Sequence, residues 1–271
     1  MPQIDANGIK MEYRVDGKEG APYVTLVTGI ANDHTMWDPQ IPELGKEFRL
    51  LRYDLRGHGD TRATEGDYSI ELLVRDLMSL LTELNIQKTH LVGLGLGGCI
   101  AQAAAIEHPL QFHSLAACCC RAQMVPDFAA LWHKLRQAVE KNGIEVIVEP
   151  TVQRWFSDEF KAAHPQVMQN VRNMIRGTTV LGYMGVTAAF LGLALEERLP
   201  QIKIPTLYLS GAEDRIGGPP ELMAELAKKV PGAKHRSVPK AAHIANIQNP
   251  RGFNAALLEF LKERREFRPA G

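Results

Sequence analysis

Short β-rich apolar runs alternate with amphipathic helical patterns along most of this chain of 271 residues. Runs of this kind are typical of strands that a parallel sheet buries on both faces. A hairpin turn at Asn7-Gly8 joins the first two strands, which are therefore antiparallel. The sequence thus predicts an α/β fold with a mostly parallel eight-stranded sheet and helices on both faces. The strands are expected at 3–5, 9–16, 23–28, 50–53, 90–93, 115–119, 206–210 and 235–238, and the main helices at 69–84, 96–107, 221–229 and 253–264.

The alternation stops in the middle of the chain and later resumes. Between 121 and 200 the patterns are helical and include Trp132, Trp155 and Tyr183. Because the chain must return to complete the sheet, we expect an inserted helical cap rather than an independent domain. The predicted organisation is a core of residues 1–120 and 201–271 with a cap of residues 121–200.

Composition limits the partners. Lys plus Arg equal Asp plus Glu at 31 each, so no overall field attracts nucleic acid or an anionic membrane. No apolar run is long enough to span a bilayer, and the first residues do not read as a secretory signal. Cys118, Cys119 and Cys120 are adjacent, which favours buried reduced thiols in a cytoplasmic protein. We expect a small-molecule substrate, and the sequence leaves homo-oligomer formation open.

The segment His90–Gly98 has the pattern strand, sharp turn, helix. This is the context of a nucleophile elbow, G-x-S-x-G, in which the central serine projects over the sheet. Gly95 occupies the central position here. Gly93, Gly95 and Gly98 also match the dinucleotide fingerprint G-x-G-x-x-G, but no acidic residue ends a strand about 20 residues later. A close-packing turn without chemistry is the second alternative. Neither alternative explains the rest of the chain.

Four further stretches carry a family resemblance: 36–40 (MWDPQ), 54–59 (DLRGHG), 154–157 (RWFS) and 242–246 (AHIAN). With the turn at Gly95, they make the chain resemble the α/β-hydrolase family, and within it the 3-oxoadipate enol-lactonases. The resemblance implies a hydrolase that acts on a small ester, lactone or similar activated carbonyl compound by a Ser-His-Asp type mechanism. The fold hosts many reactions, so the resemblance identifies the scaffold more closely than the substrate.

The resemblance also assigns the catalytic groups. Asp214, the third residue after Gly211, would be the acid of the triad, with Glu213 as a solvated neighbour. His243 follows the last strand and completes the order nucleophile, acid, base. It would take the proton of the nucleophile and later deliver it to the leaving group, while Asp214 orients the imidazole. The oxyanion hole would consist of the backbone amides of Ile30 and Leu96.

Other polar residues are assigned with their alternatives. Asp54, Arg56 and His58 are expected to be structural, and His58 as a catalytic base is the less favoured alternative. Trp155, Arg154 and Arg176 are candidate substrate-binding residues, as is Arg172, although arginines on helices are more often solvated. The histidine and acidic residues do not cluster at ligand spacings, so neither a metal nor a cofactor is expected.

Three interpretations of Gly95 remain open. Gly95 can stand in place of the serine of a hydrolase, leaving a form that traps substrate. The protein can instead be a lyase or carbon–carbon bond hydrolase in which His243 acts without a serine. It can also be a non-catalytic ligand-binding pseudoenzyme. The retained acid, base and turn favour the first interpretation.

Overall fold

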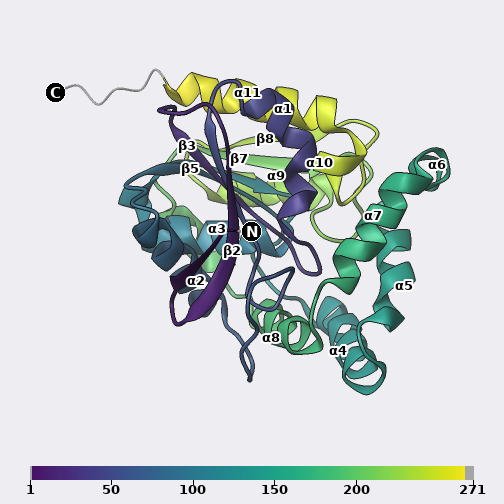
Figure 1. The fold of residues 1–271 in the computed structure, drawn as a ribbon. Helices are drawn as coiled ribbons and strands as arrows, with labels where there is room; N and C mark the ends of the chain where they lie inside the picture. The colour runs from purple at the N-terminus through teal and green to yellow at the C-terminus, as the bar shows by residue number, and fades with distance from the viewer. Residues whose placement is uncertain (1, 266–271) are drawn as a thin grey trace.

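The computed structural model describes residues 2–265. At its centre is an eight-stranded sheet in the order β1-β2-β4-β3-β5-β6-β7-β8 (Figure 1). β1 pairs antiparallel with β2, and β2 with β4, while the other neighbours are parallel. The predicted α/β fold is confirmed. The strands are β1 (Gln3–Ala6), β2 (Ile9–Gly17), β3 (Tyr23–Val27), β4 (Arg49–Tyr53), β5 (Thr89–Leu94), β6 (Phe112–Cys118), β7 (Thr206–Gly211) and β8 (Lys234–Val238).

The central strands lie between helices on both faces of the sheet. All six residues of β5 are buried, as expected for a strand covered on both sides. β6 begins at Phe112, earlier than the predicted start at Leu115. The sequence does not reveal this extension because the polar Ser114 interrupts the apolar pattern. In the structure Ser114 is buried, and its hydroxyl lies 2.8 Å from Nδ1 of His90 on β5.

Two groups of helices cover the sheet (Figure 1). α2 (Ile70–Glu83) and α3 (Leu96–Glu107) pack against each other, and α3 lies on β5 and β6. α9 (Pro220–Lys229) packs on β7 and β8. On the other face α1 (Ile41–Leu44) contacts α11 (Pro250–Arg265), which lies on β6 and β8. The short α10 (Ala245–Gln248) precedes α11.

Local signals explain where these helices begin and how closely they pack. The side chain of Ser69 accepts a hydrogen bond of 3.2 Å from the amide of Leu72 and so caps α2. α3 is rich in glycine and alanine, and all its residues from Leu96 to Ala105 are buried. Small side chains let this helix approach the sheet closely, which places its first turn at the carboxyl end of β5.

Five α-helices, which we call the cap helices, and the short 3-10 helix η3 (Glu196–Gln201) lie between β6 and β7. The cap helices are α4 (Pro126–Asn142), α5 (Glu145–Trp155), α6 (Asp158–Ala163), α7 (Pro165–Arg176) and α8 (Val180–Leu191). α4 packs on α8 and α5 on α7, and the group lies to one side of the sheet in Figure 1. Within residues 2–265 no single helix has the length and apolar composition needed to cross a membrane. One pair, α7 and α8, has them together but is bent by 90°.

Candidate active site

Gly95 forms the sharp turn between β5 and α3. Its backbone has φ +60° and ψ −123°, in the region that side chains rarely adopt. Its amide donates to the carbonyl of Cys118 on the neighbouring strand at 3.0 Å, which fixes the turn on the sheet. A Cβ atom on Gly93 would lie 2.1 Å from the carbonyl oxygen of Gly97, and one on Gly97 would lie 2.2 Å from that of Val27. Because these positions are glycines, the backbones of β5 and α3 can lie in direct contact.

The imidazole of His243 faces this turn. A Cβ atom built on Gly95 would lie 3.6 Å from Nε2 of His243, which is its nearest neighbour. The next is the Cα of Gly29, at 3.9 Å. A side chain at position 95 would thus enter open space between the histidine and the loop that follows β3. The structure brings together the turn and the base that were predicted as partners.

Asp214 holds the other side of the imidazole. Its Oδ2 lies 3.0 Å from Nδ1 of His243 and accepts a 2.8 Å hydrogen bond from the amide of Gly218. Its Oδ1 accepts from the amides of Ile216 and Gly217 at 2.9 and 3.1 Å. Burial alone would raise the pKa of Asp214, but the charge of His243, its hydrogen bond and the backbone amides hold that pKa below its ordinary value. Asp214 is therefore an ionised, buried acceptor that fixes the imidazole.

The predicted oxyanion amides lie beside the same turn. Ile30 follows Gly29 in the loop after β3, and Leu96 is the first residue of α3. Both residues line the pocket that contains Gly95 and His243. Within the described part of the chain neither amide donates a hydrogen bond to another residue. A free first-turn amide of a helix and a free loop amide are the type of donors that stabilise a developing oxyanion.

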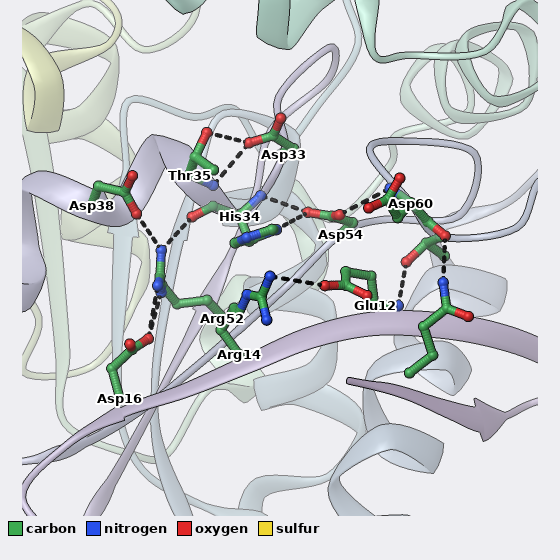
Figure 2. Close-up of polar contacts among 12 residues, drawn as sticks. Glu12, Arg14, Asp16, Asp33, His34, Thr35, Asp38, Arg52, Asp54 and Asp60 are labelled. Carbon is green, nitrogen blue, oxygen red and sulfur yellow. Dashed lines mark hydrogen bonds and ion pairs between the residues drawn. The ribbon is translucent and has the colours of Figure 1, made fainter. Parts of the chain in front are cut away.

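A partly buried polar network holds the loop that carries Ile30 (Figure 2). Oδ1 of Asp54 accepts hydrogen bonds from the amide of His34 at 2.6 Å and lies 2.9 Å from its Nδ1. Arg52 bridges Asp16, at 2.8 and 2.9 Å, and Asp38, at 2.6 Å. Figure 2 shows these groups linking the segment after β3, which continues into the 3-10 helix η1 (His34–Gln40), to β2 and β4. The network fixes the loop from below the site, which gives Asp54 its expected structural role.

Part of this network has the spacing of a metal site. Ligand atoms of Asp33, His34 and Asp54 lie within 4.8 Å of one another. However, Asp54 already engages both the ring and the backbone of His34, and Asp33 accepts from the amide of Thr35 at 2.8 Å. The expectation that histidine and acidic residues do not cluster at ligand spacings is therefore wrong for these three side chains, which are hydrogen-bonded within the network.

Arg56 and His58 also hold the structure together. Nε of Arg56 donates to Asp76 at 2.9 Å in a buried ion pair. His58 is fully buried, and its Nδ1 lies 3.1 Å from the carbonyl oxygen of Arg56. Burial lowers the pKa of His58 to about 4. His58 does not line the pocket around Gly95, so its position favours the structural role over the alternative of a catalytic base.

The pocket over Gly95 lies between the strand ends and the cap helices. Trp155 at the end of α5 is buried, with its ring centroid 6.4 Å from that of His243. Arg154, its neighbour, is half-buried and also lines the pocket. The wall is otherwise mainly apolar and aromatic, as is typical of sites for small organic ligands. It includes Leu131, Phe128, Trp132, Ile147, Tyr183, Phe190 and Ile216.

The structure does not bring Arg176 to this pocket. Arg176 is exposed on α7 and forms an ion pair with Glu145, with Nε and Oε2 2.8 Å apart. Arg172 pairs in the same way with Glu149. The buried face of α7 is formed by Met168, Val171, Met174 and Ile175. The arginines lie next to this face in sequence but point outward, so the prediction that Arg176 binds substrate is corrected.

Among the pocket residues that were not predicted, Gly217 and Arg121 bear most directly on the chemistry of the site. Gly217 lies against the ring of His243, where a Cβ would be 1.9 Å from Cε1. Arg121 lines the pocket just after β6. Its position carried a usable signal, because polar residues at the carboxyl ends of parallel strands often belong to ligand sites.

A family model described as "alpha/beta hydrolase fold" matches residues 22–250. The chain belongs to the α/β-hydrolase family. This confirms the resemblance to α/β hydrolases that the sequence motifs indicated. The match contains the turn at Gly95, Asp214 and His243.

The chain is also similar to curated proteins over nearly its whole length. It is 29% identical to 3-oxoadipate enol-lactonase 1 of Acinetobacter baylyi, over 94% of each chain. It is 26% identical to a putative carbamate hydrolase of Pantoea ananatis, over 96% of each chain. The enol-lactonase similarity expected from the sequence motifs is thus present in the whole-chain comparison.

Solved structures give the same relationship. The enol-lactonase from Burkholderia xenovorans LB400 superposes with a TM-score of 0.93 at 31% identity, over 96% of this chain and all of that one. A malate-bound thermophilic esterase from Thermogutta terrifontis gives a TM-score of 0.90 at 28% identity, over 97% and 98% of the two chains. These matches extend through the cap helices as well as the sheet.

Proposed function

We propose that this chain carries the site of an ester or lactone hydrolase of the Ser-His-Asp type in which Gly95 occupies the nucleophile position. In this proposal the protein binds a small activated carbonyl substrate and turns it over poorly. Similar proteins named as enol-lactonases and an esterase support this substrate class. The oriented pair Asp214 and His243 supports the mechanism.

One observation carries the proposal. The Cβ position of Gly95 is 3.6 Å from Nε2 of His243 and meets no atom at a closer distance. A serine hydroxyl, one bond further out, can reach Nε2 within the distance of about 2.6–3.2 Å at which a base activates a nucleophile. The backbone at Gly95 already has the strained conformation of a nucleophile elbow.

The proposed roles follow from this geometry. His243 would accept a proton on Nε2 while Asp214, bonded to Nδ1, stabilises the resulting charge. The amides of Ile30 and Leu96 would donate to the carbonyl oxygen as it becomes negative. Trp155 would pack on the substrate, and Arg154 would bind an anionic group of it. Without a hydroxyl at position 95, acyl transfer to the enzyme cannot occur, and loss of a nucleophile costs on the order of a millionfold in rate.

The test compares the protein with Gly95→Ser, Gly95→Ala and the double variant Gly95→Ser with His243→Ala. Turnover of a panel of small aryl esters and lactones is measured for each. We expect Gly95→Ser alone to be active, because alanine adds the Cβ without the hydroxyl and the double variant lacks the base. If the unchanged protein turns over a substrate at an ordinary rate and Gly95→Ser is slower, His243 acts without a serine. If no form reacts although ligands bind tightly, the site belongs to a binding protein.

A further inference from the structure

Two arginines of the pocket have no carboxylate partner. Arg121 and Arg154 both line the cavity over Gly95, and neither forms an ion pair with any residue in 2–265. The two arginines whose side chains are most buried in the described residues, Arg52 and Arg56, both pair with carboxylates. A buried or half-buried cation without a counter-ion is costly unless a ligand supplies the charge.

Arg121 is held rigidly at the edge of the sheet. Its carbonyl oxygen accepts a 2.9 Å hydrogen bond from Nε2 of Gln102 on α3. One terminal nitrogen of its guanidinium donates to the carbonyl of Ile216 at 2.9 Å, and the group lies 4.2 Å from the ring centroid of Phe128. Contacts from a core helix, an active-site loop and a cap helix therefore fix its direction. A guanidinium fixed in this way loses little freedom when it binds an anion.

Arg121 has an unused donor. Its Nε is buried and has no hydrogen-bond partner in the described structure. Burial lowers the pKa of Arg121, and the charge of Asp214 opposes that shift. Asp214 cannot serve as a direct partner, because its oxygens are already bonded to His243 and three backbone amides. An unsatisfied buried donor on a charged group costs more than one on a neutral group, and an anion bound at the guanidinium would offset part of that cost.

Arg154 is anchored separately. Its terminal nitrogen lies 3.3 Å from the hydroxyl of Thr151 on the same helix. Burial lowers its pKa, and the phenolic group of Tyr183 opposes this shift. The anchors of Arg121 and those of Arg154 share no residue. The two guanidiniums are therefore held in the pocket independently of each other.

We infer that Arg121 is an anion-binding residue of this pocket and that, together with Arg154, it selects a small ester or lactone bearing two carboxylates. The inference rests on the proposed function for the reaction at Gly95, but it concerns recognition and can be tested without turnover. An apolar wall with two unpaired cations favours a ligand whose carbon skeleton packs on the aromatic residues while its charged ends meet the arginines.

Calorimetric titration of the unchanged protein with succinate and glutarate, against butyrate and pentanoate of the same chain lengths, tests the inference. We expect each dicarboxylate to bind at least about tenfold more tightly than its monocarboxylate, since a charge-assisted hydrogen bond contributes roughly 1.5–3 kcal/mol. Arg121→Gln is expected to remove this preference. Arg121→Lys, which retains the charge but loses Nε, should give an intermediate value. Arg176→Gln is the matched control on the exposed face of the cap and should leave the preference for dicarboxylates unchanged.

Equal affinity for the two ligand classes in the unchanged protein would overturn the inference, whatever the stability of the variants. A preference that persists in a folded Arg121→Gln protein, checked by its thermal unfolding, would overturn the role of Arg121. The result is separable from the proposed reaction. Arg121-dependent binding without activity in Gly95→Ser would refute the hydrolase mechanism alone, and activity on neutral esters without any dicarboxylate preference would refute the inference alone.

Discussion

Gly217 lies directly against the imidazole of His243. A Cβ atom at position 217 would be 1.9 Å from Cε1 and 2.3 Å from Nδ1 of the ring. The amide of Gly217 also donates to Asp214 at 3.1 Å. One glycine thus orients the acid through its backbone and leaves room for the base through its missing side chain.

Gly217→Ala, introduced into the Gly95→Ser form, is expected to displace His243 and lower ester turnover. A displacement of about 1 Å from productive geometry costs on the order of a hundredfold in rate. Gly192→Ala, at a helix end where a Cβ would make ordinary contacts at 3.7 Å, is the control. Measured kcat/KM values for the three proteins check the prediction, and unchanged activity of the Gly217→Ala form would contradict the placement of His243.

Gly95→Ser and Gly95→Ala should lower the free energy of unfolding by similar amounts. The backbone at position 95 has φ +60°, and a side chain there costs about 1–3 kcal/mol, although the space around it is open. Urea denaturation measures the loss. Gly143→Ala, also at positive φ (+79°) with no atom within 4 Å of its Cβ position, gives a backbone cost of similar origin far from catalysis. A loss at position 95 well above that control would indicate a clash that the structure does not contain.

His58 is expected to make the protein less stable in acid. Burial lowers its pKa from 6.5 to about 4, so the folded state keeps it neutral while the unfolded state binds a proton. Its contribution is complete above pH 6.5 and is lost as pH falls toward 4, by roughly 3 kcal/mol. The free energy of unfolding of the protein and of His58→Gln, measured between pH 7 and 4, tests this. If the free energies of unfolding of the two proteins change in parallel with pH, His58 does not titrate in this way.

His34 should have the opposite pH dependence. Burial acts to lower its pKa, but the hydrogen bond to Asp54 and the charges of Asp54 and Asp33 raise it above 6.5. The stabilisation by His34 is therefore complete below pH 6.5 and is lost as pH rises through the raised pKa. Titration of the ring by NMR gives this pKa directly, with His34→Gln used to assign the resonance. A value below 6.5 would contradict the ion pair in Figure 2.

The sheet and the order of the site residues can be predicted from the sequence because both depend on local patterns. The inner parallel strands are short buried runs, and Asp214 follows one of them, β7, while His243 follows the more exposed strand β8. Strand ends meet at one edge, so chain order is enough to bring these groups together. Arg121 follows β6 in the same way and could have been identified by the same reasoning.

Other features depend on contacts between distant segments. Arg176 is next to Ile175, which is buried, but whether it faces the pocket or Glu145 depends on how α7 packs on α5. The sequence shows that residue 217 is glycine but not that its loop meets an imidazole 26 positions later. The network around Arg52 is equally hidden, because it joins Asp16 on β2 with Asp38 in the 3-10 helix η1 (His34–Gln40).

The backbone of His243 is itself bound to the cap. Its amide donates to the carbonyl oxygen of Trp155 at the end of α5 at 3.1 Å, and Ile244 donates to the same oxygen at 3.4 Å. Nearby, Nε2 of Gln248 donates to the hydroxyl of Ser157 at 2.8 Å. The cap helices and the histidine loop thus form one mechanical unit at this point. A chimaera that exchanges the cap between related hydrolases must take the histidine loop from the same parent, or the imidazole will lose its alignment although no catalytic residue has been replaced.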